Sequence, residues 1–466
     1  MLEFYYAFYR GEFEKKIKEL SLEINRILEL EGVSIVATDQ QVIEEEHRSL
    51  LKQDTYRQIN NLFYTIRAQN LSDHFLLKKY LPEFRQHPPG SSFLFADFFA
   101  GAGGLSQGLI QAGFTPAFVN DSEIDAVETY YFNHSLPLDY FFAGDIRDLI
   151  KNPSLFLPYV KNIRVVTGGP PCQGFSMANR QRLKDDPRNE LYKDFLIVLG
   201  HIRPDFFIME NVPGMKNKVL EIEKDIQEYT DTDYQFTELR LNAKDFGIPQ
   251  NRQRYFLIGN KVGFGSLRLE LNIKMQASGF PRYVLKDALH GLPAVKVNPH
   301  KLKLSYESDE NGFMIRKQET SANSFISEIN SGKASGYIFN HKSRYNQPRD
   351  VEIFSKLKEG ADSLDPAIAS LMPYQSRNTV FKDKYFRLDR EKVCKTITAH
   401  MRHDCNSYIH PIQARGLTPR EAARIQTFPD DYFFRGSPND WYQQIGNAVP
   451  VKLAEILACE IKRFYE

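Results

Sequence analysis

Apolar residues between positions 93 and 259 gather in five short runs, most of them followed by a polar turn and residues with helical spacing. Short continuous apolar runs are typical of strands buried on both faces. Their alternation with helices is typical of a doubly wound, mostly parallel sheet. We therefore predict an α/β fold. The predicted strands are residues 93–96, 116–120, 164–167, 205–209 and 255–259.

The rest of the chain has different patterns. In residues 1–90, apolar positions recur every three or four residues from Phe13 onward, which predicts amphipathic helices. We interpret this N-terminal extension as a helical cap or partner-binding hairpin. The strand–helix alternation occupies residues 91–260 and stops in residues 261–394, which indicates a separate, irregular unit. Helical spacing returns in residues 395–466.

The composition restricts the class of protein. With 42% hydrophobic and 26% charged residues, the 466-residue chain is typical of a globular protein with one large domain and smaller units. It has no apolar run of the roughly 20 residues that cross a bilayer, no signal-peptide pattern and no C-x-x-C pair among its four cysteines. We expect a cytoplasmic protein without disulfides, zinc or membrane contact. Because the net charge is +1, binding to a nucleic acid would require basic residues concentrated on one face.

The segment 168–176, GGPPCQGFS, follows the third apolar run. A strand that ends in two glycines and two prolines places Cys172 at the carboxyl edge of the sheet, where open α/β folds bind ligands. The prolines also restrict the backbone around the cysteine. A thiol held in this way is suited to nucleophilic catalysis. The alternative is a buried structural cysteine, because free cysteine is among the most buried residue types.

Glycines and carboxylates occupy the turns after the first strands. Gly101, Gly103 and Gly104 lie in the first strand-to-helix turn, where glycine allows the backbone to approach a ligand. Asp121 follows the second strand and can accept both hydroxyls of a ribose, and Asp145 in the next turn can accept an adenine amino group. Taken singly, the glycines also fit a structural turn and the aspartates fit helix caps.

These segments resemble the motifs of the DNA (cytosine-5) methyltransferases. GGPPCQ resembles the nucleophile motif of that family, and the glycine turn resembles its first motif. GluAsnVal at 210–212 and GlnAsnArgGlnArg at 250–254 resemble two further motifs, and residues 415–426 and 444–450 resemble the ninth and tenth. All stand in the family's order along the chain. The resemblance implies a Rossmann-like fold of the class I S-adenosylmethionine-dependent methyltransferases.

The resemblance also implies roles for individual residues. Cys172 would attack C6 of cytosine and make C5 nucleophilic, and Glu210 would act at N3 of the ring. Arg252 and Arg254 would hold the base, Glu210 and a phosphate. The cofactor would be S-adenosylmethionine, with no metal, and the family usually has glutamate where this chain has the shorter Asp121. The implied cofactor contacts are Phe99, Ala100, Gly101, Ala102, Gly104, Asp121, Asp145, Ile146, Pro171, Leu191, Asn447 and Ala448.

The irregular unit 261–394 lies where the family has its target-recognition domain, and residues 91–260 and 395–466 would form the catalytic domain. Basic residues interleaved with aromatics in 341–349 and 377–392 would contact phosphates and base edges of DNA, unless they form an ordinary solvated surface. The resemblance implies a monomeric enzyme of the bacterial cytoplasm. It would methylate a flipped-out cytosine in double-stranded DNA, within a restriction–modification system that includes a cognate restriction endonuclease.

Two other functions are compatible with the catalytic motifs. The tRNA cytosine-5 methyltransferases resemble this chain, but they carry Pro-Pro-Cys-Gln-Pro-Phe and a Cys-Phe-Thr element, whereas this chain has Gly174 and no Cys-Phe-Thr. A catalytically silent DNA-binding homologue would have lost the cysteine, the glutamate or the glycine turn, and all three are present here. We therefore favour an enzyme that modifies DNA.

Overall fold

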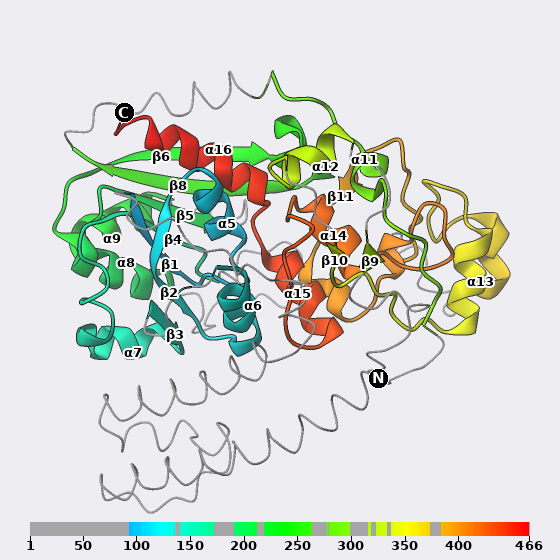
Figure 1. Cartoon of the computed structure of the whole chain (residues 1–466), viewed down its shortest axis with the longest axis horizontal. Coiled ribbons are helices and arrows are strands. Elements are labelled where there is room, and N and C mark those ends of the chain that lie inside the picture. The colour runs from blue at the N-terminus through cyan, green and yellow to red at the C-terminus, as the bar shows by residue number, and fades with distance from the viewer. Residues whose placement is uncertain are drawn as a thin grey trace, which may run out of the picture.

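A seven-stranded sheet forms the centre of the protein (Figure 1). Its strands are β1 (Leu94–Phe98), β2 (Thr115–Asp121), β3 (Phe141–Ala143), β4 (Ile163–Gly168), β5 (Phe206–Asn211), β6 (Tyr234–Asn242) and β8 (Gln253–Lys261). They lie in the order β3-β2-β1-β4-β5-β8-β6. The five strands from β3 to β5 run parallel, and β8 runs antiparallel to both of its neighbours. The prediction of a mostly parallel sheet is confirmed.

The computed structural model describes the chain from residue 93 to residue 465, apart from several internal segments. The helices predicted in residues 1–90 and the predicted nucleophile Cys172 lie outside the described residues. No helix in the described part is long and apolar enough to cross a membrane. The described residues are 93–134, 136, 140–171, 191–211, 219–262, 277, 279–298, 316–317, 323–332, 337–372 and 384–465.

The five predicted strands are all present, and their ends agree with the prediction to within two residues. The two strands missing from the prediction lie at the edges of the sheet. Strand β3 has only three residues, and β6 mixes buried and exposed positions, so neither forms the continuous apolar run that marks a central strand.

Helices cover both faces of the sheet, which buries the apolar side chains of the central strands. On one face, α5 (Gly104–Gln111) and α16 (Val451–Lys462) pack over strand residues that include Phe95. On the other face, α8 (Leu191–Ile202) and α9 (Val219–Thr230) pack over the strand side chains that alternate with these and point to the opposite side of the sheet. The remaining α-helices and short strands are α6 (Ile124–His134), α7 (Ile146–Lys151), α11 (Leu285–Leu289), α12 (Ser324–Ile329), α13 (Pro348–Lys356), α14 (Pro419–Ile425), α15 (Pro438–Asn447), β7 (Gln250–Asn251), β9 (Arg316–Lys317), β10 (Tyr337–Ile338) and β11 (Cys394–Lys395).

The end of the chain returns to the first helix of the sheet domain. Helix α16 lies against α5 so closely that a Cβ on Gly108 would come within 2.4 Å of the Cβ of Ala454. Only glycine permits this approach. Upstream, α14 begins with the predicted capping box: the Thr418 hydroxyl accepts from the Glu421 amide, and the Glu421 carboxylate accepts from the Thr418 amide at 2.7 Å. The C-terminal segment therefore supplies part of the same core.

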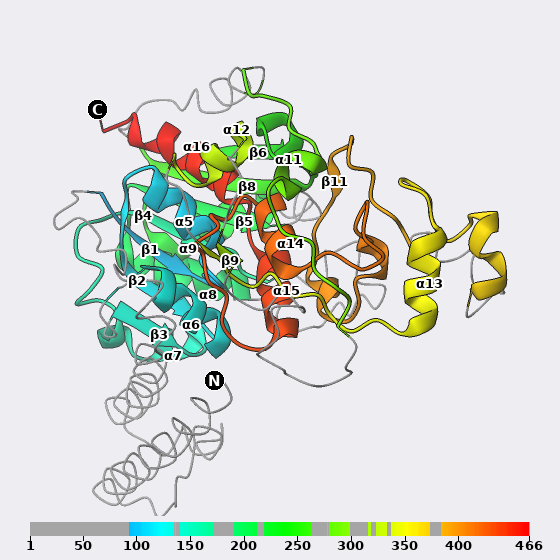
Figure 2. The same cartoon turned by 45° about the vertical axis from the view of Figure 1, so that its right-hand side comes forward.

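Helices α14 and α15 lie between the sheet and the irregular unit, whose far end carries α13 (Figures 1 and 2). Two ion pairs at α14 are fully buried. Arg415 pairs with Glu421 at 2.6 Å, and Arg424 pairs with Asp430 through two contacts of 2.6 and 2.8 Å. Arg424 also donates to the carbonyl oxygen of His290 from the irregular unit. These charges therefore connect the irregular unit to the C-terminal segment.

The prediction that both basic clusters face DNA is wrong for several of their described residues. The Arg387 guanidinium donates to the carbonyl oxygens of Phe354 and Leu357 at 2.9 and 2.7 Å, and Arg344 donates to that of Met401 at 2.7 Å. His341 is buried. The last carbonyls of a helix have no partner within it, and Arg387 satisfies two of them at the end of α13. A sequence pattern of interleaved basic and aromatic residues therefore does not show whether the basic side chains bind backbone carbonyls of the protein or contact DNA.

Two buried histidines make the protein sensitive to acid. His341 donates from Nε2 to the carbonyl oxygen of Pro293 at 2.8 Å, and its Nδ1 lies 2.9 Å from the Thr418 hydroxyl, an arrangement that fits the neutral ring. Burial lowers the pKa of His341 and of His410 from 6.5 to about 4. Because the unfolded chain binds protons first, the free energy of unfolding should fall as the pH drops from 6.5 to 4, by about 3 kcal/mol for each histidine.

Urea unfolding measured across this pH range checks the expectation. His341→Gln should lower stability at pH 8 and flatten the decrease between pH 6.5 and 4. The exposed His400→Gln should retain the wild-type slope. An unchanged slope in His341→Gln would show that His341 does not control the acid response.

Candidate active site

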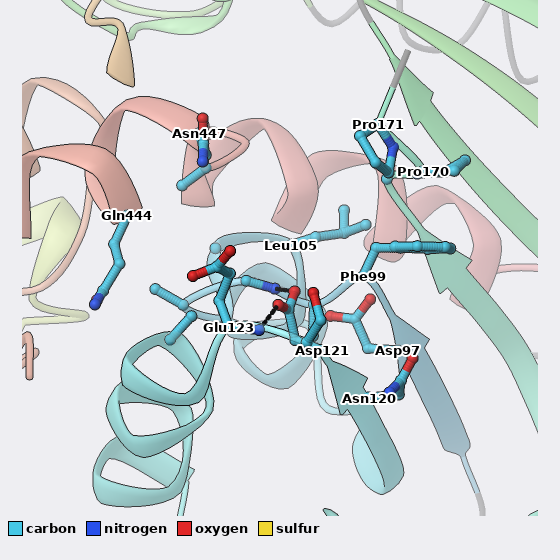
Figure 3. A pocket seen from close by; sticks show the side chains of 18 of the residues that line it. Asp97, Phe99, Leu105, Asn120, Asp121, Glu123, Pro170, Pro171, Gln444 and Asn447 are labelled. Carbon is cyan, nitrogen blue, oxygen red and sulfur yellow. Dashed lines mark hydrogen bonds between the residues drawn. The ribbon is translucent and has the colours of Figure 1, made fainter. Parts of the chain in front are cut away.

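A pocket of about 670 Å³ opens at the carboxyl edge of the parallel strands. Its walls come from the turns after β1, β2, β3 and β4, from the start of α8 and from the end of α15 (Figure 3). All of the cofactor contacts implied by the sequence motifs line this one pocket, and so do Glu210 and Arg254. The predicted residues that line it are Phe99, Ala100, Gly101, Ala102, Gly104, Asp121, Asp145, Ile146, Pro171, Leu191, Asn447 and Ala448.

The C-terminal segment contacts the glycine turn and fixes its position. The hydroxyl of Tyr432 donates to the carbonyl oxygen of Ala102 at 2.5 Å and lies 3.1 Å from Nε2 of His134. Gly103 has a φ of 81°, and a Cβ there would lie 2.9 Å from the Tyr432 hydroxyl. Phe99 also has a positive φ, of 56°, which is strained for a residue with a side chain. The surrounding packing therefore imposes the shape of the turn.

Buried carboxylates form one wall of the pocket. Asp97 on β1 is 1% exposed and accepts from the hydroxyls of Ser106 and Thr167. Burial raises its pKa to about 7, and burial also raises the pKa of Asp121 to about 6. No arginine or lysine in the described part of the chain forms an ion pair with Asp97. The wall is therefore suited to a ligand that carries positive charge.

The turn after β3, next to Asp121, adds a further carboxylate and apolar side chains to the pocket. Asp145 is the N-cap of α7, and its carboxylate accepts from the Arg147 amide at 2.9 Å. Ile146 is buried beside it, and half-buried Leu191 begins α8. Asp145 thus caps a helix and lines the pocket at the same time, so the two interpretations of the sequence are both compatible with its position.

Arg252 does not have the predicted position. It lies between β7 and β8, so the alternation of a strand does not place it on the same face as Arg254. Its side chain is fully buried and donates to the carbonyl oxygens of Ile397, Gly446 and Ala448. The prediction that it holds the base is wrong. Arg252 instead fixes the backbone of the C-terminal segment where that segment lines the pocket.

Glu210 and Arg254 form an ion pair at the edge of the pocket. Glu210 near the end of β5 and Arg254 near the start of β8 are 14% and 12% exposed, and 2.7 Å separates Glu210 Oε1 from Arg254 Nε. A Cβ on Gly169 would lie 3.3 Å from Glu210 Oε2, and Asn211 donates to the carbonyl oxygen of Pro170 at 3.0 Å. The carboxylate therefore lies beside the backbone that leads into Cys172.

Sequence reasoning missed several residues of this site. Tyr432 and His134 act through contacts between segments about 300 residues apart, which no local pattern reveals. Glu123 and Asp440 also line the pocket. Glu123 follows Asp121 by two residues, so its place in the pocket could have been predicted from its closeness to Asp121 in the sequence.

The sheet, its helices on both faces and the pocket at its carboxyl edge define a Rossmann-like fold of the class I methyltransferases. The family model for C-5 cytosine-specific DNA methylase matches residues 93–463, and the chain belongs to this family. Its activity is the methylation of cytosine in DNA at carbon 5. The comparison confirms the family that the motifs predict.

Curated relatives extend this likeness over most of their length. The chain is 33% identical over 390 residues to the type II methyltransferase M.DdeI of Desulfomicrobium norvegicum, covering 79% of this chain and 88% of the relative. It is 32% identical over 371 residues to M1.HphI of Haemophilus parahaemolyticus, covering 79% and 86%. A solved E. coli structure, assigned as a DNA modification methyltransferase encoded within a prophage, matches 80% of this chain and 99% of its own at 25% identity, with a TM-score of 0.60.

Proposed function

We propose that the protein transfers a methyl group from S-adenosylmethionine to carbon 5 of a flipped-out cytosine in a short sequence of double-stranded DNA, by covalent attack of Cys172 on C6. The observation that carries this proposal is the Glu210–Arg254 ion pair in the same pocket as the glycine turn. A carboxyl group and a candidate cofactor site thus share one pocket, which is also lined by Gly169, Pro170 and Pro171, the residues that precede Cys172 in the sequence.

The residues of the pocket fit S-adenosylmethionine. Asp97 and Asp121 offer negative charge near the glycine turn, where the cationic methionine half would lie, and Ile146 and Leu191 offer apolar contact for an adenine ring. When bound, the cofactor supplies an electrophilic methyl group. The glycine turn brings backbone close to the ligand, and Asn447 and Ala448 line the pocket from the end of α15.

The chain's own residues would perform the remaining steps. The Cys172 thiolate forms a bond to C6, and Glu210 donates a hydrogen bond or proton at N3, where negative charge develops. C5 would then take the methyl group, with S-adenosylhomocysteine as the other product. Release of the C5 proton to solvent water and return of the N3 proton to Glu210 would break the S–C6 bond and free the product and the thiolate. Arg254 holds the Glu210 carboxyl group in position throughout.

The biological setting that we propose is a restriction–modification system. The relatives M.DdeI and M1.HphI are named type II methyltransferases. The target cytosine would be protected from a cognate endonuclease, and the irregular unit 261–394 would select the sequence. Because an enzyme cannot reach both C5 and C6 of a stacked base, the cytosine must leave the helix.

Bisulfite sequencing of host DNA after expression of the protein tests the reaction. Conversion should be blocked at one cytosine of a single recurring motif. Complete conversion with soluble protein, together with methyl transfer to tRNA, would favour the tRNA enzyme instead. Complete conversion with neither activity would favour a silent DNA-binding homologue.

Cys172→Ser should abolish turnover and leave binding to DNA nearly unchanged, because serine is a much weaker nucleophile at the same position. The motif found by bisulfite sequencing defines the duplex for both assays. A duplex with 5-fluorocytosine at the target should give a denaturation-resistant complex with the wild type and none with Cys172→Ser. Cys459→Ser, at an exposed cysteine on α16, is the matched control. An equal loss of DNA binding in Cys172→Ser would show that the thiol serves the fold.

A further inference from the structure

The irregular unit holds the backbone of the C-terminal segment through a buried asparagine. Asn340 follows β10 by two residues and is fully buried. Its amide nitrogen donates to the carbonyl oxygen of Phe434 at 3.0 Å, and its amide oxygen accepts from the Phe434 amide at 3.0 Å. The backbone of Asn340 has a φ of 58°, in the left-handed region that asparagine tolerates better than most residues. This side chain therefore binds both backbone polar groups of Phe434.

A second asparagine binds the neighbouring residue from the sheet domain. Asn133, near the end of α6, donates to the carbonyl oxygen of Phe433 at 2.8 Å and accepts from the Phe433 amide at 2.9 Å. One turn earlier on α6, the hydroxyl of Thr129 accepts from the Arg435 amide at 2.8 Å. Residues 432–435, which we call the linking segment, thus lie between α6 and the irregular unit and are bound by side chains from both.

The linking segment begins with the tyrosine that contacts the glycine turn. The Tyr432 hydroxyl donates to the carbonyl oxygen of Ala102, which is buried and lines the pocket. A Cβ on Gly103 would lie 2.9 Å from the same hydroxyl, so the turn and the tyrosine are closely packed. Because a buried carbonyl that loses its donor is costly, a displaced linking segment would also disturb the turn.

We propose that Asn340 is a positioning residue for cofactor binding, which acts on the glycine turn through the linking segment and the Tyr432 hydroxyl. Neither Asn340 nor Tyr432 is among the residues that line the pocket, so their effect reaches the cofactor through the backbone of the turn. The unit that we assign to target selection thereby also supports the cofactor site. This inference rests on the proposed use of S-adenosylmethionine.

Calorimetric binding of S-adenosylhomocysteine to the full chain tests this role in a double-mutant cycle. Tyr432→Phe should bind it about tenfold more weakly, because the buried carbonyl of the turn loses its donor. Asn340→Gly should bind it about fivefold more weakly; glycine adopts a left-handed φ without strain, so the change removes the two hydrogen bonds and keeps the backbone. The double variant should bind within about twofold of Tyr432→Phe, because the two residues act along one route.

Asn323→Gly is the matched control. Asn323 also belongs to the irregular unit, and its side chain likewise donates to a backbone carbonyl, that of Asp287 at 3.0 Å, and accepts from a backbone amide, that of Ile326 at 2.8 Å. Its affinity for S-adenosylhomocysteine should match that of the wild type. Wild-type affinity in Asn340→Gly, equal losses in Asn340→Gly and Asn323→Gly, or fully additive losses in the double variant would each overturn the proposal.

Amide hydrogen exchange of the wild type tests the same link without a substitution. Bound S-adenosylhomocysteine should slow exchange of the Phe434 amide, which donates to Asn340, and leave that of the Ile326 amide, which donates to Asn323, unchanged. Slower exchange that is confined to the glycine turn would contradict the proposal. If the wild type binds no S-adenosylhomocysteine, the proposed cofactor itself is wrong, and this inference is wrong with it.

Discussion

Glu210→Gln should slow methyl transfer to DNA by about 100-fold or more, which is the usual contribution of a general acid. Glutamine fills the same space and keeps a hydrogen-bonding group, but it cannot supply a proton at N3 of the base. Glu210 is held by Arg254 at 2.7 Å and lies near Gly169 in the pocket, and the sequence motifs assign the cofactor contacts to other residues. Binding of S-adenosylhomocysteine should therefore change by less than about threefold.

Single-turnover transfer of labelled methyl groups, with calorimetry of cofactor binding on the same samples, separates the two effects. The exposed Glu228→Gln on α9 should retain the wild-type rate. A loss of cofactor affinity as large as the loss of rate would assign Glu210 to the cofactor site rather than to the chemistry.

Asp430→Ala should reduce the free energy of unfolding by about 3–5 kcal/mol, the usual cost of removing one partner from a buried ion pair. The Arg424–Asp430 pair is fully buried, and Asp430 also accepts from the side chain of Asn330 at 3.1 Å. Removing its carboxylate leaves the Arg424 guanidinium without its counter-charge. Since Arg424 and Asn330 both link the irregular unit to the C-terminal segment, the two units should lose their attachment together.

Urea unfolding followed by far-ultraviolet circular dichroism measures this loss. The double variant Arg424→Met with Asp430→Ala should recover part of the stability, because no unpaired charge stays buried. Lys356→Ala, which removes an exposed pair with Glu352 on α13, should leave the unfolding midpoint unchanged. A single variant as stable as the wild type would show that the buried pair contributes nothing to folding.

The parts of the fold that sequence predicts well depend on local patterns. The apolar runs of the central strands and the capping box at Thr418 are properties of neighbouring residues. The edge strands β3 and β6 are not visible in this way, because one is very short and the other is partly exposed.

The candidate site shows the same division. The glycine turn, Asp121 and Asp145 follow strand ends, so their meeting in one pocket could be predicted from the topology of parallel sheets. Arg252 could not be placed, because it lies in a break between two strands and its guanidinium donates to backbone carbonyls from a segment almost 200 residues later in the chain. The hydrogen bond from Tyr432 to Ala102 joins residues 330 positions apart, and only the folded chain reveals it.

The contacts of Tyr432, Asn447 and Ala448 with the pocket have a consequence for the order of synthesis. A ribosome makes the glycine turn first, the irregular unit next and this last wall of the pocket at the end. A nascent or prematurely terminated chain therefore has no complete cofactor site. If the proposed function is correct, we expect methylation only from molecules that already carry the segment we assign to target selection, so incomplete translation products should not modify the genome.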